Sequence, residues 1–207
     1  MRLGLAKTAP ILVGLVLGSG AAVVSSSRVV GIAGATGSGK SSLADYLHTH
    51  TKTVGTVIRV DDFYTGQRVD LSQRTIDAEE PTWETPDVFD WKAFTTAVTT
   101  AVDRASCDAP DAFVICEGFL LFANPEARDL VDIPLFLDVS ENTSLARRWH
   151  RNSDGCTLAL LEKYHQKHAW PAFLKYRRNL PADTHVISAD GDFQPVCQTA
   201  LSILSDL

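Results

Sequence analysis

The segment 34–42, with the sequence Gly-Ala-Thr-Gly-Ser-Gly-Lys-Ser-Ser, carries the clearest chemical pattern in the chain. It matches GxxxxGK[ST], and it lies between an apolar, β-branched run at 28–33 and a helical pattern that starts at Leu43. Glycines let backbone N–H groups turn towards phosphate oxygens, the lysine neutralises the β- and γ-phosphates, and the serine hydroxyl completes Mg²⁺ coordination. The pattern therefore predicts a site for ATP or another nucleoside triphosphate with Mg²⁺, formed by Gly34, Thr36, Gly37, Ser38, Gly39, Lys40, Ser41 and Ser42.

Acidic residues follow two further apolar runs. The run 54–60 reads as a buried strand and ends in Asp61 and Asp62, and the run 113–116 ends in Glu117. Open α/β sheets bind ligands at the carboxyl ends of their strands. A kinase needs a carboxylate near the acceptor hydroxyl, a second near Mg²⁺, and basic residues over the transferring phosphoryl group. Asp61, Glu117 and an arginine cluster meet these needs; the cluster consists of Arg147, Arg148 and Arg151.

Each of these residues also has a purely structural interpretation. The two aspartates could cap a turn, Glu117 could be a strand-end carboxylate paired with an arginine, and the three arginines could form a solvated helix face. The spacing does not decide which of Asp61 and Asp62 would be the general base. Because the three features occur together in one order, the kinase interpretation is favoured.

Composition, net charge and absent motifs argue against several other classes of protein. The 207 residues are 45% hydrophobic and 21% charged, which is typical of one folded domain. A net charge of −6 argues against a nucleic-acid backbone as the main partner. A guanine-reading Asn-Lys-x-Asp motif is absent, which argues against a GTPase, and the chain is short for a motor. Four widely spaced cysteines read as reduced thiols, and His165 with His168 reads as a solvated helix face in preference to a metal site.

The first 27 residues differ from the rest. No charged residue occurs from Thr8 to Ser27, and Arg2 and Lys7 precede this stretch. It has the shape of a signal peptide, but it is short and glycine-rich for a membrane span. A cleaved targeting peptide, a flexible or membrane-associated extension, and a misplaced start all remain open. Because the motifs need cellular nucleoside triphosphate, we expect a cytoplasmic protein, with an extension at 1–27, a kinase domain at 28–207, and membrane contact only if the extension is retained.

Apolar runs and helical patterns alternate along the remaining chain. The sequence predicts strands at 28–33, 54–60, 113–116, 135–139 and 185–187, and helices from Leu43 and at 91–104, 142–151, 158–178 and 193–207. Strands that alternate with helices form βαβ units. The predicted fold class is α/β: a three-layer P-loop NTPase fold with a mostly parallel central sheet, helices on both faces and a small lid.

At these residues the chain resembles the nicotinamide riboside kinases, within the wider uridine kinase and phosphoribulokinase group of P-loop kinases. The resemblance covers about residues 29–192. Besides the phosphate motif, it includes Asp-Asp-Phe-Tyr at 61–64, Glu-Gly-Phe-Leu-Leu-Phe at 117–122 and Trp-Pro-x-x-x-Lys-Tyr-Arg at 170–177. The last two strings are much more specific than the phosphate motif.

The resemblance implies a role for each matching residue. Asp61 would be the general base on the ribose 5′-hydroxyl, with Asp62 supporting it, and Glu117 would be the carboxylate on the metal side. Trp83 would stack on the base of the acceptor. Glu84, which stands where the family has Asp, would accept hydrogen bonds from the ribose 2′- and 3′-hydroxyls.

The resemblance also implies roles for two arginines, an activity and a class of partner. Arg148 would help to bind the ribose, Arg151 would belong to the lid, and the loop 189–191 lies where the family packs adenine. The implied activity is ATP- and Mg²⁺-dependent phosphorylation of nicotinamide riboside. A uridine or cytidine kinase is the alternative, and a non-catalytic nucleotide-binding protein tethered by its N-terminal segment is the alternative from another class. The partner would be a small-molecule nucleoside, not a nucleic acid, and the protein a monomer or weak homo-oligomer.

Overall fold

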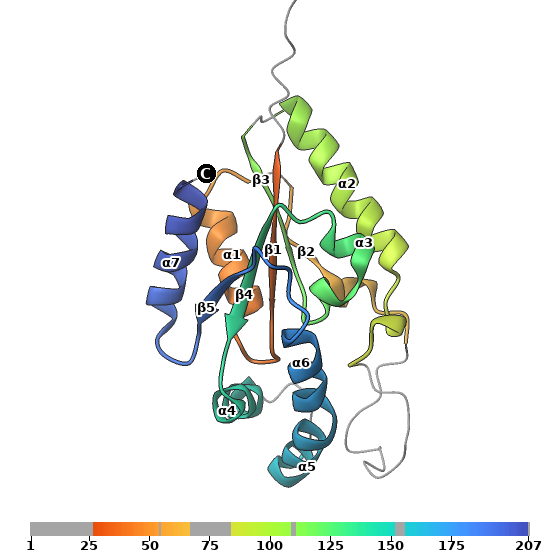
Figure 1. Ribbon diagram of the computed structural model, residues 1–207, viewed down its shortest axis with the longest axis vertical. Helices are drawn as coiled ribbons and strands as arrows, with labels where there is room; N and C mark the ends of the chain where they lie inside the picture. The colour runs from red at the N-terminus through yellow and green to blue at the C-terminus, as the bar shows by residue number, and fades with distance from the viewer. Residues whose placement is uncertain (1–26, 54, 67–83, 109–110, 152–155, 207) are drawn as a thin grey trace, which may run out of the picture.

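A five-stranded, wholly parallel sheet forms the centre of the protein (Figure 1). The structure, a computed structural model, describes residues 27–53, 55–66, 84–108, 111–151 and 156–206. The strand order is β2-β3-β1-β4-β5. The strands are β1 (Arg28–Gly34), β2 (Ile58–Arg59), β3 (Phe113–Glu117), β4 (Ile133–Asp138) and β5 (His185–Ser188).

Helices cover both faces of the sheet. In Figure 1, α1 (Lys40–His50) and α7 (Phe193–Ser205) lie on one side, and α2 (Trp91–Asp108) and the short α3 (Pro125–Arg128) lie on the other. A further group of helices lies beyond the carboxyl ends of the strands: α4 (Glu141–Arg151), α5 (Leu158–Tyr164) and α6 (Trp170–Arg177). The three-layer α/β fold expected from the sequence is therefore confirmed, and the third group lies where a lid was expected.

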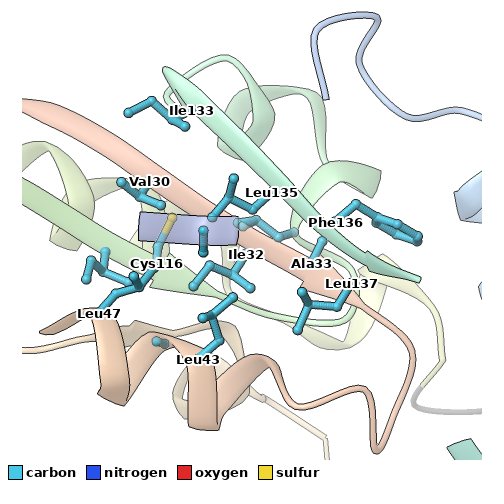
Figure 2. Close-up of a cluster of buried hydrophobic side chains, with 14 of the residues drawn as sticks. Val30, Ile32, Ala33, Leu43, Leu47, Cys116, Ile133, Leu135, Phe136 and Leu137 are labelled. Atoms are coloured by element: carbon cyan, nitrogen blue, oxygen red, sulfur yellow. The ribbon is translucent and has the colours of Figure 1, made fainter. Parts of the chain in front are cut away.

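The core explains why the sheet is parallel and buried. β1 and β4 consist almost wholly of apolar residues, because helices exclude water from both of their faces. Figure 2 shows Leu43 and Leu47 of α1 reaching towards Ile32 of β1 and Cys116 of β3. Leu43, Leu47 and Ile32 are fully buried. This packing fixes α1, and with it the residues at its first turn, against the sheet.

The strand expected at 54–60 was predicted too long. Only Ile58 and Arg59 pair with β3, and Val60–Phe63 forms a single 3₁₀ turn, η1. β2 lies at the edge of the sheet, and Gly55 upstream takes a left-handed φ of 70°, which interrupts extended backbone. The consequence is local: Asp61 and Asp62 lie in a turn just past the sheet edge.

The helix expected at 158–178 is interrupted. Between α5 and α6, residues His165–Ala169 form a π-helical segment, η5. Pro171 has no backbone N–H and its ring crowds the carbonyl four residues earlier, which disfavours a regular helix at this point. The segment turns His165 fully inward, so the expected solvated histidine face is wrong for this residue. Within the described ranges, no cluster of three or more potential metal-binding side chains occurs.

Some sequence predictions fall on residues that the structure does not describe. These are the N-terminal segment up to Ser26, Trp83, and residues 152–155 beside α4. Among the helices that are described, none is long and apolar enough to cross a membrane. Cys116, Cys156 and Cys197 are free thiols, as expected.

Candidate active site

The phosphate motif forms a tight loop between β1 and α1. Gly37 and Gly39 have φ values of 70° and 97°, which L-residues with side chains rarely adopt. A Cβ atom on Gly37 would lie 2.7 Å from the backbone oxygen of Ser144 in α4. The hydroxyl of Ser144 in turn donates a hydrogen bond to the carbonyl of Thr36, at 2.7 Å. The loop therefore requires glycine at position 37, and α4 packs directly on it.

Lys40 opens helix α1 and is half-buried at the loop. Its Nζ donates to the carbonyl of Ala35 at 3.0 Å, across its own loop. Burial lowers the pKa of Lys40, and the charges of Glu117 and Asp61 counteract part of that shift. Lys40 forms no ion pair with any of the described carboxylates. It is thus a desolvated cation at the bend of a glycine loop, suited to an anionic phosphate.

Ser41 and Glu117 bring two oxygen ligands together at the start of α1 and the end of β3. The Ser41 hydroxyl donates to Glu117 Oε1 at 2.9 Å. Burial raises the pKa of Glu117, while Lys40 and the Ser41 hydrogen bond lower it. Mg²⁺ in nucleotide sites takes one or two protein oxygens and completes its shell with phosphates and water. This oxygen pair fits that requirement.

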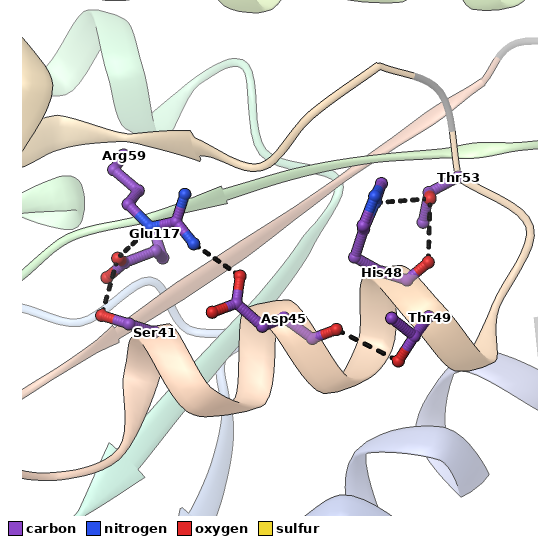
Figure 3. Close-up of polar contacts among 7 residues, drawn as sticks. All are labelled: Ser41, Asp45, His48, Thr49, Thr53, Arg59 and Glu117. Carbon is purple, nitrogen blue, oxygen red and sulfur yellow. Dashed lines mark hydrogen bonds and ion pairs between the residues drawn. The ribbon is translucent and has the colours of Figure 1, made fainter.

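Arg59 joins this site from the edge strand, and no sequence pattern indicated it. Its Nε lies 3.6 Å from Glu117 Oε1, and its guanidinium also pairs with Asp45 of α1 at 2.5 Å (Figure 3). The structural alternative considered for Glu117, pairing with an arginine, therefore occurs together with the serine contact. The partner could not be named beforehand because nothing in the chain spacing links position 59 to position 117.

Asp61 and its neighbour Asp62 are both exposed, in the turn η1. The Asp61 carboxylate acts electrostatically on Lys40, Glu117 and Glu84. Its catalytic role stays a prediction.

The second half of the site is a buried charged cluster. Glu84 and Arg148 are 7% and 5% exposed, and Glu84 Oε1 lies 4.0 Å from the Arg148 guanidinium. The Tyr164 hydroxyl donates to the same oxygen at 3.1 Å, and Arg148 lies over the Tyr164 ring at 5.3 Å. Burial raises the pKa of Glu84, and Arg148 and Tyr164 counteract this shift. The structure thus brings Glu84 and Arg148 together, and adds Tyr164, for which the sequence held no specific signal.

The three arginines of α4 lie in three environments, so the solvated-face alternative fails for two of them. Arg148 is buried. Arg147 donates to the carbonyls of Ala189 and Gly191, at 2.8 and 2.9 Å, and so holds the loop after β5. Arg151 is exposed, and its charge acts on Lys40 by lowering the pKa of that amine. Only Arg151 remains a solvated cation near the phosphate loop.

A pocket of about 300 Å³ lies beside the loop that Arg147 holds. Its lining includes Ser140, Trp170, Phe173 and Asp190. Asp138, at the end of β4, forms two hydrogen bonds with Arg177 at 2.9 and 2.6 Å on its wall. The pocket adjoins the segment 189–191, where the family resemblance implies an adenine site.

His165 is the one described buried histidine, and neither of its ring nitrogens has a hydrogen-bond partner in the described part of the chain. The ring stacks on Trp170, with centroids 5.8 Å apart. Burial, aided by the charge of Arg148, lowers the pKa of His165 from 6.5 to about 4. The imidazole is therefore neutral at physiological pH.

This depressed pKa makes folding stability depend on pH. Between pH 6.5 and 4 the unfolded chain binds a proton at His165 that the folded chain does not, so stability falls as pH falls. The slope is at most about 1.4 kcal/mol per pH unit. We expect His165→Phe to flatten the decline in Tm over this range, while His185→Asn, at an exposed position of β5, should not. Parallel curves for wild type and His165→Phe would contradict the assignment.

Sequence comparison finds relatives that are named as kinases, in agreement with the phosphate loop and its neighbouring residues. No protein-family model matches the chain. It is 27% identical over 169 residues to uridine kinase-like protein 3 of Arabidopsis thaliana, which covers 70% of this chain and 35% of that protein. It is 26% identical over 174 residues to a uridine kinase of Vibrio vulnificus, covering 72% of this chain and 80% of that one. The chain thus spans about a third of the Arabidopsis relative.

Solved structures give the same answer for the fold. A protein described as a fructose transport system kinase from Silicibacter sp. TM1040 matches with a TM-score of 0.54 and 25% identity, over 78% of this chain and 90% of that one. These matches support a place among the uridine kinase-like P-loop kinases. A sugar kinase from Janibacter sp. HTCC2649 shares the fold with a TM-score of 0.55 at 17% identity, over 86% of this chain and 95% of that one.

Proposed function

We propose that this uridine kinase-like chain uses ATP to phosphorylate a hydroxyl group of a nucleoside. One observation carries the proposal: helix α4 connects the phosphate-side residues, through the hydrogen bond from Ser144 to Thr36, with a buried acceptor-side pair, Glu84 and Arg148. A protein that only binds ATP needs the first group. The second group, a desolvated carboxylate paired with Arg148, suits a polar acceptor that brings its own hydroxyl groups.

The residues on the phosphate side have distinct roles in this proposal. The glycine loop binds the ATP phosphates, and Lys40 neutralises charge on the β- and γ-phosphates. Ser41 and Glu117 would hold Mg²⁺, which supplies further positive charge at the phosphate oxygens when it is bound. Arg151, exposed at the end of α4, would act from the lid on the transferring phosphoryl group.

The residues on the acceptor side orient the nucleoside. Glu84 and Arg148 bind the ribose diol, and Asp61 accepts the proton of the attacking 5′-hydroxyl. Asp62 supports Asp61. Trp83 is proposed, from its place in the sequence, to stack on the base.

Two nucleosides are candidates for the acceptor. The similarity to proteins named uridine kinase favours uridine or cytidine. The strings at 117–122 and 170–177 favour nicotinamide riboside, with nicotinamide mononucleotide as product, which would serve NAD salvage. A cationic nicotinamide ring over an indole face gains roughly 0.5–2 kcal/mol that a neutral base lacks. The reaction draws on cellular ATP, and we therefore propose a cytoplasmic enzyme.

A turnover assay with the full chain tests the function. ADP release from ATP is measured with uridine, cytidine, nicotinamide riboside and, as a non-nucleoside control, fructose. We expect acceptor-dependent ADP release with at least one nucleoside and little with fructose. Turnover with fructose alone would contradict the proposal and favour a sugar kinase, and ADP release that no acceptor stimulates would favour a nucleotide-binding protein.

The diol contact can be tested at Glu84. We expect Glu84→Gln to lower kcat/KM for the ribonucleoside by about 10- to 100-fold, because a charge-assisted hydrogen bond in a buried site is lost. The 2′-deoxynucleoside, which offers one hydroxyl fewer, should lose less. The measurement is kcat/KM for both substrates with both enzymes. Equal losses would indicate that Glu84 stabilises the fold and does not contact the acceptor.

A further inference from the structure

Arg59 occupies an unusual place for a cation in a proposed metal site. It lies on β2, between Asp45 on helix α1 and Glu117 at the end of β3 (Figure 3). Helix α1 also carries Ser41, which donates to Glu117. The side chains of Ser41, Glu117, Arg59 and Asp45 thus form a connected chain of contacts that links three elements around one carboxylate.

Both contacts to Glu117 fall on one oxygen. Oε1 accepts the hydrogen bond of Ser41 at 2.9 Å and lies 3.6 Å from Arg59 Nε. The Glu117 side chain is 6% exposed, so bulk water does little to hold it. Two partners on one oxygen restrict the rotation of the carboxylate about its last bond, which fixes where its other oxygen points.

The pair between Arg59 and Asp45 contributes little as an isolated ion pair. The Asp45 side chain is 61% exposed and that of Arg59 is 34% exposed, and ion pairs at such positions add little to folding stability. The effect of this ion pair on the orientation of Arg59 is larger than its effect on folding stability. Asp45 pairs with Nη2 of the planar guanidinium, which holds the adjacent Nε close to Glu117.

We propose that Arg59 is a positioning residue: it orients Glu117 for Mg²⁺ binding, and Asp45 holds Arg59 in place. The proposal rests on the proposed function, because it assigns Glu117 to the metal side. A lysine could not replace it, since its single ammonium nitrogen cannot lie close to both Asp45 and Glu117, as two guanidinium nitrogens do.

Arg59 could also have the opposite effect and weaken Mg²⁺ binding, and the experiment distinguishes the two effects. A positive charge 3.6 Å from Glu117 Oε1 also repels a divalent cation. If repulsion dominated, removal of Arg59 would tighten Mg²⁺ binding. If orientation dominates, as proposed, removal weakens it.

The experiment measures binding without turnover. Calorimetry gives the affinity for ADP as a function of Mg²⁺ concentration, and in EDTA, for wild type, Arg59→Gln, Arg59→Lys, Asp45→Asn and the double variant Asp45→Asn/Arg59→Gln. Arg128→Gln serves as control, because its pair with Asp129 at 3.2 Å is exposed and lies away from the site. Thermal unfolding of each variant checks the fold.

We expect the half-saturating Mg²⁺ concentration to rise about 10-fold in Arg59→Gln and several-fold in Arg59→Lys, with ADP affinity in EDTA changed less than about twofold. Asp45→Asn should raise the half-saturating Mg²⁺ concentration less. The double variant should need no more Mg²⁺ than Arg59→Gln, because both substitutions act through one chain of contacts. Arg128→Gln should match wild type.

Two outcomes overturn the inference. One is an unchanged or lower Mg²⁺ requirement in Arg59→Gln, and the other is a rise in Arg59→Gln with none in Arg59→Lys, which would indicate charge without orientation. The proposed function fails separately, if the wild-type chain binds ADP with Mg²⁺ yet phosphorylates no nucleoside. If wild-type ADP binding does not respond to Mg²⁺, both fail.

Discussion

Replacing Lys40 with alanine should abolish phosphoryl transfer and leave the fold intact. Lys40 lies at the bend of the phosphate loop, and its one described hydrogen bond goes to its own loop, at Ala35. Loss of a preorganised charge of this kind costs about 10²–10³-fold in rate or more. Because burial lowers the pKa of this amine, the folded chain bears a desolvation cost for the charge, and its removal should not lower Tm.

The measurement is single-turnover phosphorylation, with circular dichroism to check the fold. Lys92→Ala is a suitable control, since Lys92 is an exposed lysine on α2, which covers the sheet face opposite α1. Near-normal turnover by Lys40→Ala would refute the assignment of the glycine loop as the phosphate site.

Asp61→Asn should lower kcat by at least about 10²-fold with little change in the acceptor KM. The amide keeps the size of the side chain but cannot accept the hydroxyl proton, and general-base catalysis is typically worth about 10²–10⁴-fold. The family resemblance at 61–64 is what selects Asp61 over its neighbour.

Asp62→Asn is the matched control for this substitution. It makes the same chemical change one residue later in the same turn, and we expect a milder effect. Steady-state kinetics of the two variants gives the comparison. If Asp62→Asn proves the more damaging, the roles of the two neighbouring aspartates must be exchanged.

The sequence was sufficient for the features that local chemistry determines. The glycine loop, the strand before it and the helix after it follow from one motif, and the parallel sheet follows from alternating apolar runs and helical patterns. Glu84 and Arg148 were paired only through a resemblance to a known family. Their closeness in the structure depends on how α4 folds back over the loop, which no short-range pattern encodes.

The features that were missed arise from long-range contacts. Arg59 meets Glu117 across an edge strand only two residues long, and Tyr164 meets Glu84 from a helix 80 positions away in the chain. His165 was assigned to a solvated face because a regular helix was assumed. The π-helical segment, with Pro171 just after it, turns that ring into the interior instead.

Helix α4 gives the two halves of the site a mechanical connection. Its Ser144 holds the carbonyl of Thr36 in the phosphate loop, and Arg148, one turn later on the same rigid helix, faces Glu84. A displacement of the loop is therefore transmitted through α4 to the pair of Glu84 and Arg148, and a displacement of that pair is transmitted to the loop. Binding free energies linked in this way are reciprocal. We therefore expect ATP to tighten acceptor binding, and the acceptor to tighten ATP binding by the same factor.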